Sequence, residues 1–320
     1  MRPSKSFRPS VYIALAVSLA LPSCGLAAPS ASPFDGDRAY TLLEEIVALG
    51  PRVSGTKEAE QTRAIIRREL KAAGVPLEEH SFEAATPLGA RNMVNLVAVI
   101  EGTEPGVIIL GNHYDTKYFP DFEFVGANDG GSTTAWMIEM ARTLGPTREG
   151  HTLWLCWFDG EEAFLDWTRE DSLYGSRAMV KRLREEGRLA DVRAMINVDM
   201  IGDCQLTISK DRDAPEWMTN LVWRTAKKLG HQNEFNPLRE GIEDDHYPFR
   251  RAGVPAMDII DFRYGGGRAS HDMNWHTTRD RMDLVCASSL KIVGDVIYKV
   301  LERLDDALRQ LEAREGELED

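Results

Sequence analysis

Acidic side chains and a histidine follow four separate apolar segments of this 320-residue chain. The segments, in "VIILGNHYD", "LWLCWFDGEE", "AMINVDMIGD" and "AMDIID", are rich in β-branched and aromatic residues, which is typical of buried strands. Ligands of open α/β sheets sit at the carboxyl ends of the strands, so we expect these polar residues to gather at one edge of a sheet. They are His113 and Asp115; Asp159, Glu161 and Glu162; Asp199 and Asp203; Asp258 and Asp261.

Carboxylates and imidazoles at one edge repel and desolvate one another unless a cation compensates their charge. Oxygen and imidazole ligands without thiolate suit Zn²⁺ in a catalytic site. Capping of strand ends and ion pairing is the alternative interpretation. Glu161 and Glu162 are adjacent and flanked by aromatic residues. Burial and repulsion there raise the pKa of one carboxyl, which suits a group that acts first as a base and then as an acid.

Helices and strands alternate along the chain, which predicts an α/β fold. At 43% hydrophobic residues, the chain supports one large core, so we expect a single domain with a central mixed, mostly parallel twisted sheet and helices on both faces. "EGTEPG" is expected to form a hairpin or a tight connection, and "CQLTIS" follows the fourth predicted strand. Strands are predicted over residues 92–100, 106–115, 151–158, 192–202 and 254–261, and helices over 39–49, 56–74, 130–144, 174–186, 214–229 and 293–311.

Residues 1–31 are expected to be a signal peptide and tether rather than part of the fold. Arg2, Lys5 and Arg8 precede an apolar run that is shorter than a membrane span and fits a secretory signal. "LPSC", ending at Cys24, resembles a lipoprotein cleavage box, and an ordinary cut near "GLAAPSA" is the alternative. We therefore expect an exported protein, periplasmic or extracellular, that contacts a membrane only through a lipid at Cys24.

The formal charge of −13 argues against nucleic acid as a partner. Three cysteines remain beyond the leader, and Cys156 lies in an apolar run, where a small core residue is expected. Two of the three could pair in an oxidising compartment. His80, His151 and His231 have no motif around them and are expected at the surface.

Six motifs in order give this chain a resemblance to the glutaminyl cyclases (glutaminyl-peptide cyclotransferases), relatives of the zinc aminopeptidases. They are "GNHYDTKYFP", "GANDGGST", "DGEEAF", "DSLYGSR", "EDDHYPFRRAGVP" and "WHT". The resemblance covers about residues 40–304, and we place the catalytic domain at residues 38–312 and an acidic tail at 313–320. It implies a zinc-aminopeptidase-like fold, a monomer, and cyclisation of the N-terminal glutamine of peptides or proteins to pyroglutamate with release of ammonia.

The resemblance also implies the site. One Zn²⁺ per chain would be held by Asp129, Glu162 and His276, which leaves a fourth position open as a catalytic zinc requires. Glu161 would be the proton shuttle. Asp244 and Asp199 would support the substrate and the base through hydrogen bonds. Trp167 and Trp275 would form walls of the substrate pocket.

Three points stay open. Asp258 stands where animal cyclases carry a histidine; bacterial relatives have acids there, and we include it in the catalytic set. His113 and Asp199 occupy the place of a second metal in dinuclear aminopeptidases, and we favour a hydrogen-bonding role for them here. The alternatives are a dinuclear zinc aminopeptidase that hydrolyses N-terminal residues, and a noncatalytic peptide-binding protein.

Overall fold

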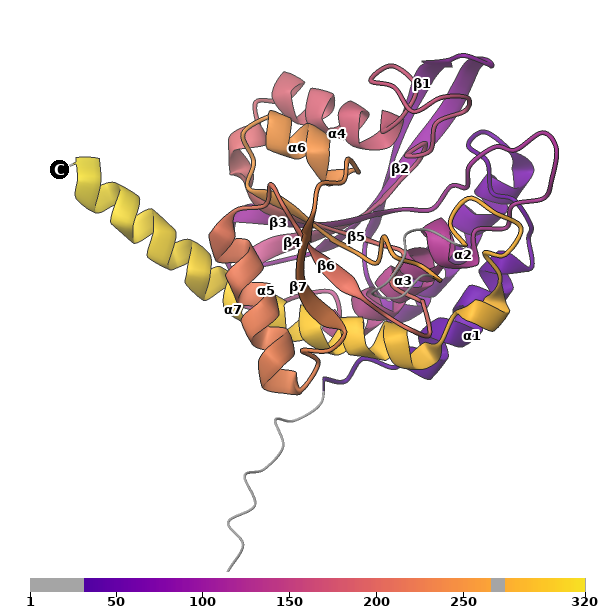
Figure 1. The fold of residues 1–320 in the computed structure, drawn as a ribbon. Helices are drawn as coiled ribbons and strands as arrows, with labels where there is room; N and C mark the ends of the chain where they lie inside the picture. The colour runs from indigo at the N-terminus through magenta and orange to yellow at the C-terminus, as the bar shows by residue number, and fades with distance from the viewer. Residues whose placement is uncertain (1–31, 266–273, 320) are drawn as a thin grey trace, which may run out of the picture. The chain divides into compact units, whose positions relative to one another are not determined.

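A six-stranded sheet lies at the centre of the computed structural model, which describes residues 32–265 and 274–319 (Figure 1). The strand order is β1-β2-β4-β3-β5-β8. Strand β2 pairs antiparallel with β1 and β4, whereas β3–β4, β3–β5 and β5–β8 are parallel. The predicted mixed, mostly parallel sheet is thereby confirmed. The strands are β1 (Leu77–Thr86), β2 (Gly89–Ile100), β3 (Glu104–His113), β4 (His151–Phe158), β5 (Val192–Asp199) and β8 (Ala256–Ile260).

Helices cover both faces of this sheet, as predicted. Alternate residues of β3 show the two faces: Ile108 and Leu110 belong to one buried cluster, and Val107 and Ile109 belong to another. The first cluster lies under α1 (Gly36–Val47), α2 (Lys57–Ala73), α3 (Thr133–Leu144), α5 (Glu216–Leu229) and α7 (Ala287–Glu319). The second lies under α4 (Tyr174–Glu185) and α6 (His246–Arg251), which Figure 1 shows together on the opposite face.

The ends of α2 follow the sequence signals for a cap and a stop. The side chain of Thr56 accepts the N–H of Ala59, and Gly74 ends the helix in the left-handed conformation at φ +70°. Ile65, Ile66 and Leu70 are buried on its inner face. This helix was therefore predictable from residue types alone.

"EGTEPG" makes a tight connection, one of the two expected forms; it forms no hairpin because β4 lies between β2 and β3 in the sheet. Two strands were not predicted. Strand β1 was missed because it is an edge strand with both faces partly exposed, so charged residues interrupt any apolar alternation. Also missed was β7 (Phe235–Glu240), which pairs in parallel with β6 (Ile208–Asp211) in a separate two-stranded sheet.

A disulfide joins Cys204 to Cys286, and Cys156 is a buried free cysteine, as expected. The bridge links the segment after β5 to the segment before α7, where backbone hydrogen bonds from Cys204 to Leu284 and from Cys286 to Gly202 run alongside it. It closes a loop with a sequence separation of 82 residues. In the chain-entropy account such a crosslink stabilises the fold by about 4.5 kcal/mol.

The helix α7 is longer than predicted and is tied to the start of β4. Asp305 accepts hydrogen bonds from the backbone N–H of His151 at 2.9 Å and from Arg148, and it pairs with the His151 ring at 2.8 Å. The expectation that His151 lies at the surface was wrong, since only 2% of it is exposed. Residues 313–319, assigned to an acidic tail, are the last residues of the helix.

The predicted signal peptide and the possible anchor at Cys24 lie outside the described residues. Over residues 32–265 and 274–319, no helix combines the length and the apolar character needed to cross a membrane.

Candidate active site

Three parallel strands deliver polar residues to one edge of the sheet. His113 is the last residue of β3, Asp199 is the last residue of β5, and Glu161 and Glu162 follow β4 after a two-residue turn. Their carboxyl ends meet because β4, β3 and β5 are neighbours that run in the same direction. The expectation that polar residues gather at this edge is confirmed for these four residues.

Asp129 reaches the same place from a distorted turn, Ala127–Ser132, that precedes α3. Its backbone is extended at ψ 112°, and Gly130 has φ +68°. A Cβ atom on Gly130 would lie 2.6 Å from the carbonyl oxygen of Asp115 and 3.0 Å from the His113 ring. Only glycine fits there. The break also explains why α3 begins at Thr133 rather than at residue 130, where the apolar pattern placed it.

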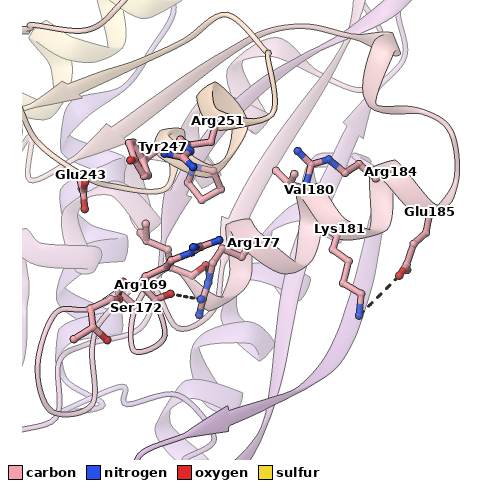
Figure 2. Close-up of a pocket in the computed structure, with 13 residues that line it drawn as sticks. Arg169, Ser172, Arg177, Val180, Lys181, Arg184, Glu185, Glu243, Tyr247 and Arg251 are labelled. Atoms are coloured by element: carbon pink, nitrogen blue, oxygen red, sulfur yellow. Dashed lines mark hydrogen bonds and ion pairs between the residues drawn. The ribbon is translucent and has the colours of Figure 1, made fainter.

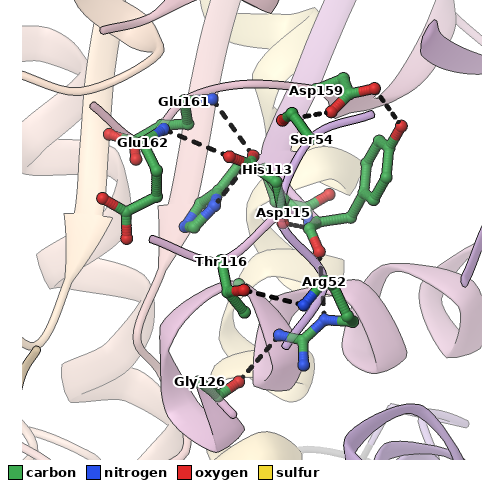
Figure 3. Close-up of polar contacts among 12 residues, drawn as sticks. Arg52, Ser54, His113, Asp115, Thr116, Gly126, Asp159, Glu161 and Glu162 are labelled. Atoms are coloured by element: carbon green, nitrogen blue, oxygen red, sulfur yellow. Dashed lines mark hydrogen bonds and ion pairs between the residues drawn. The ribbon is translucent and has the colours of Figure 1, made fainter. Parts of the chain in front are cut away.

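Two buried side chains hold this turn in position. Asp280 accepts the backbone N–H groups of Asn128 at 2.7 Å and Asp129 at 3.1 Å. The Arg52 guanidinium, fully buried, donates to the carbonyl oxygens of Tyr114, Val125, Gly126 and Asp129, and Figure 3 shows it beneath the site. Burial lowers the pKa of Arg52 to about 10. Sequence reasoning missed both residues, because nothing near them in the sequence distinguishes them from surface charges.

Glu161 and Glu162 are fixed through their backbone. The Asp115 carboxylate accepts the N–H of Glu161 at 3.1 Å and the N–H of Glu162 at 3.4 Å (Figure 3). The carbonyl of Glu161 accepts the N–H of Leu173 at 2.8 Å. Asp171 accepts the N–H groups of the residues at 164 and 165, so the whole "EEAFLDWTREDSLYGSR" segment folds back on itself.

His276 adopts a backbone conformation that is rare for a residue with a side chain, at φ +53°. Its ring stacks on Trp275 with centroids 3.9 Å apart and meets the ring edges of Phe119 and Phe124. Such strain is maintained only where the surroundings fix it, and it is concentrated at functional sites.

These side chains form two triads that share Asp129. In the first, His276 Nε2 lies 2.9 Å from Glu162 Oε1 and 3.3 Å from Asp129 Oδ2. In the second, His113 Nε2 lies 3.2 Å from Asp129 Oδ1 and 3.3 Å from Asp199 Oδ1. Within each triad, the candidate ligand atoms all lie within 4.8 Å of one another.

The first triad fits a zinc ion. Two donors bound to a tetrahedral Zn²⁺ at about 2.0–2.1 Å lie about 3.3 Å apart, close to the spacings in the triad. Asp129 Oδ2 is buried and accepts no hydrogen bond from the described residues. Burial opposes charge on His276, but Glu162 and Asp129 outweigh it and raise its pKa to about 10. The negative electrostatic potential of the two carboxylates at His276 Nε2 therefore favours a cation at this place.

Glu161 differs from Glu162 in its surroundings. Burial raises its pKa well above the usual range, and the charges of Asp244, Glu162 and Asp245 raise it further against the effect of His113. Burial, with Asp199 and Asp245, likewise raises the pKa of Asp244 well above its ordinary value. Neither glutamate is more than 7% exposed, but only Glu162 contacts His276. The two adjacent carboxylates are therefore chemically distinct.

A cavity of about 490 Å³ opens over the first triad. Trp167 and Trp275 are part of its wall, and Trp167 is 40% exposed. Met200, Ile260 and Phe262 also line it and were not predicted, since they read as ordinary core residues. The predicted site residues that line it are Asp129, Glu161, Glu162, Trp167, Asp199, Asp244, Trp275 and His276.

Two predicted site residues lie behind this wall. His113 is 1% exposed and contacts the cavity only through Asp129 and Asp199. Asp258 is in the middle of β8, where it pairs with Asn197 and accepts its side-chain amide at 3.2 Å. Burial, followed by the charge of Asp244, raises the pKa of Asp258 well above its usual range. The residue of β8 that reaches the cavity is Ile260.

The remaining acids at the strand ends accept hydrogen bonds from backbone N–H groups and buried hydroxyls. This agrees with the alternative interpretation of the sequence, in which such acids cap strand ends. Asp159 accepts hydrogen bonds from Ser54, Tyr114 and the N–H of Val94. Asp203 and Asp261 accept backbone N–H groups in the loops that follow β5 and β8.

Comparison with known proteins places this arrangement in a family. The model of Peptidase family M28 matches residues 95–301. A glutaminyl-peptide cyclotransferase from Bos taurus is 32% identical over 260 residues, which are 71% of this chain and 69% of that protein. The crystal structure of an Acidobacteriales bacterium glutaminyl cyclase has a TM-score of 0.81 and 36% identity, covering 91% of this chain and 100% of that one.

A structure described as a Zn-dependent exopeptidase, from Parabacteroides distasonis, is also similar, with a TM-score of 0.74 and 25% identity over 86% of this chain and 99% of that one. The family match, the sequence identity and the structural similarity thus agree with one another. This chain belongs to peptidase family M28 and, within it, to the glutaminyl-peptide cyclotransferases.

Proposed function

We propose that this protein cyclises the N-terminal glutamine of peptides or proteins to pyroglutamate and releases ammonia. The observation that carries the proposal is the position of Glu161, a buried carboxylate outside the Asp129–Glu162–His276 triad, in the wall of the same cavity. Relatives of this chain bear the name glutaminyl-peptide cyclotransferase, and the chain itself has Glu161 beside the candidate metal ligands.

One Zn²⁺ would be held by Asp129 Oδ2, Glu162 Oε1 and His276 Nε2. Three protein ligands leave one position for the substrate. When bound, zinc supplies a Lewis acid that polarises the γ-carbonyl oxygen of glutamine. The ring of Trp275 and the backbone at His276 fix the imidazole, and the Asp115 carboxylate fixes the backbone of Glu162.

Glu161 would transfer the proton. The α-amine of the glutamine attacks the carbonyl carbon of the γ-carboxamide in the same residue, so the reaction is intramolecular and depends on holding one conformer. Glu161 takes a proton from the amine as the new C–N bond forms and gives it to the amide nitrogen as the old C–N bond breaks and ammonia leaves. A carboxyl whose pKa is raised by burial suits both transfers.

Asp244 and Asp199 would orient the substrate amine and the base, since both line the cavity beside Glu161. Trp167 and Trp275 would enclose the glutaminyl side chain. Asp258, behind Asp244, would act as a positioning residue rather than contact the substrate, because Ile260 takes its place in the cavity wall.

The second triad supports a second candidate function, a dinuclear aminopeptidase. His113, Asp129 and Asp199 have the spacing of a further metal site, with Asp129 shared between the two triads. Two metals would favour activation of a water for peptide hydrolysis, whereas a cyclase needs no water.

Metal content and substrate choice separate the two functions. A cyclase is expected to bind one zinc per chain, release ammonia from Gln-initiated peptides and leave leucine anilides intact. Two metals per chain with anilide hydrolysis would identify the aminopeptidase. Peptide binding that is equal in the apoprotein and in an Asp129→Ala variant, without release of ammonia, would instead identify a binding protein.

We further propose that the protein acts after export, as a monomer, with residues 1–31 as its leader. Residues 38–312 would be the catalytic domain. The Cys204–Cys286 disulfide supports export because disulfides persist in oxidising compartments. Mass analysis of the mature N-terminus in the native host tests lipidation at Cys24 directly.

A further inference from the structure

A second cavity, of about 640 Å³, is larger than the active-site cavity. Its wall is built from the loop that precedes α4, from α4 itself and from α6 with the residue at 243 (Figure 2). Its volume is within the range of cavities that hold peptide-sized or drug-sized ligands, about 300–1,000 Å³. Nothing in the proposed chemistry uses this cavity.

The charged side chains around the second cavity are mostly cationic. Five cations line it against two carboxylates, Glu185 and Glu243. The chain as a whole has the opposite balance, with 38 lysines and arginines against 51 acids. The cations therefore gather here against the general trend. They are Arg169, Arg177, Lys181, Arg184 and Arg251.

Three of these arginines lack an acidic partner. Among the described residues, no carboxylate lies within ion-pair distance of Arg169, Arg184 or Arg251, although Arg251 packs over the Tyr247 ring at 5.9 Å. The guanidinium of Arg177 is occupied by the backbone carbonyls of residues 169, 170 and 173. Figure 2 shows the arginine side chains on both sides of the cavity.

The second cavity adjoins the active-site cavity. Glu243 lines both. Trp167 lines the catalytic cavity and its neighbour in sequence, Thr168, lines the second one. The two cavities are therefore neighbours, close enough for one peptide whose N-terminal residue occupies the catalytic cavity to reach the cationic cavity with later residues.

We propose that this cavity binds acidic residues that lie downstream of the N-terminal residue in the peptide substrate. The inference rests on the proposed function, and it adds the substrate class: Gln-initiated chains with aspartate or glutamate a few residues from the N-terminus. Arginine guanidinium groups recognise carboxylates with paired hydrogen bonds, and three of them are free to do so here. Glu243 stands at the junction, so an acid directly after the glutamine gains less than one further along.

Kinetics on matched peptides test this specificity. Each peptide begins with glutamine and carries a pair of aspartates, alanines or lysines moved stepwise along an otherwise identical chain. Exposed ion pairs change binding about two- to fivefold each, so kcat/KM for the best aspartate peptide is expected to exceed that of the alanine peptide by roughly three- to tenfold. The difference is expected in KM, because these contacts are remote from the reacting atoms. It shrinks as salt rises from about 0.1 M to about 1 M.

Charge reversal assigns the effect to the cavity. Arg184→Glu with Arg251→Glu is expected to bring the aspartate peptide to within twofold of the alanine peptide and to leave kcat for the alanine peptide unchanged. Arg224→Glu with Lys228→Glu is the matched control: both are exposed residues of α5 that do not line this cavity, and the change in net charge equals that of the double reversal. It is expected to keep the preference.

The outcomes separate this inference from the proposed function. If the alanine peptide is not cyclised, the proposed function itself fails. If all peptides are cyclised at equal kcat/KM, or if the double reversal keeps the aspartate preference, the enzyme is a cyclase but the cavity does not select acidic chains. A preference lost equally in the control with Arg224→Glu and Lys228→Glu would show an effect of net charge alone and would also overturn the inference.

Discussion

Glu161 and Glu162 are neighbours in sequence but face different partners. Glu162 lies 2.9 Å from His276, within the triad that includes Asp129. Glu161 lies in the cavity wall near Asp244, where burial and like charge raise its pKa. Because the turn after β4 fixes both backbones through Asp115, the two side chains cannot exchange roles.

Replacing Glu161 with glutamine removes the proposed proton-transfer group while keeping its size. We expect Glu161→Gln to lower kcat by about 100- to 10,000-fold, the usual contribution of general acid–base catalysis. Zinc content, measured by mass spectrometry of the metal, is expected to stay unchanged. Glu162→Gln is the paired variant and is expected to lose zinc. A zinc-replete Glu161→Gln variant with full activity would contradict the assignment.

Sequence reasoning at the residue scale found most of the cavity wall, because strand-end acids and the cyclase-like motifs point to it. It missed Arg52 and Asp280, which act through backbone groups and carry no local signal. It grouped Asp258 with the catalytic residues because Asp258 stands where animal cyclases carry a histidine, whereas in the structure it lies opposite Asn197 in the middle of β8. Which residues of a strand reach the cavity depends on the packing around the strand, which the motif does not encode.

The turn that carries Asp129 depends on Gly130. Gly130→Ala is expected to destabilise the fold and to lower zinc affinity, because its Cβ would push against the Asp115 carbonyl and the His113 ring at φ +68°. Gly187→Ala is a matched control with φ +69° and nothing within 4 Å of the added carbon. The control is expected to show only the cost of the left-handed conformation, about 1–2 kcal/mol, and full activity. Denaturant unfolding and zinc titration measure both effects, and equal behaviour of the two variants would refute the steric account.

The contact between α7 and β4 makes stability depend on pH. Hydrogen bonds from His151 and Arg148 outweigh burial and lower the pKa of Asp305. A lowered folded-state pKa stabilises the protein above the ordinary carboxyl pKa of about 4, and this contribution is lost as pH falls. Asp305→Asn is therefore expected to reduce the free energy of unfolding by about 1–3 kcal/mol near pH 7 and by progressively less below pH ~4.

Asp306→Asn provides the control for this experiment, since Asp306 is exposed and pairs with Arg309 at the surface. This substitution is expected to change the free energy of unfolding by no more than about 0.5 kcal/mol at every pH. Unfolding in urea over a pH series measures both variants. A loss in Asp305→Asn that does not change with pH would show that the carboxylate charge is not responsible.

Elements with strong periodicity or clear caps were predictable, as α2 and the buried strands β3, β4 and β5 show. The elements that were not predicted have weaker local sequence signals. Strand β1 is a charged edge strand, and β7 belongs to a small separate sheet. Strand β4 lies between β2 and β3 in the sheet. This order depends on contacts between residues far apart in the sequence, so the short connection between β2 and β3 does not reveal it.

At the scale of the whole molecule, both the single-domain α/β fold and the family were accessible from the sequence. The cationic cavity was not, because its residues lie on a loop and two helices that are separated in the sequence. Only folding brings these charges together beside the catalytic cavity. The pairing of Cys204 with Cys286 was likewise left open by the sequence, because three cysteines allow several pairings.

The most direct test of the central claim is mass spectrometry of a Gln-initiated peptide incubated with the purified protein. The same peptide with an acetylated N-terminus is the control, since it has no free amine to attack the side chain. We predict a mass loss of one ammonia for the free peptide only, abolished by a zinc chelator and restored by added zinc. An unchanged Gln-initiated peptide in the presence of zinc-replete protein, or release of its first residue by hydrolysis, would contradict the account.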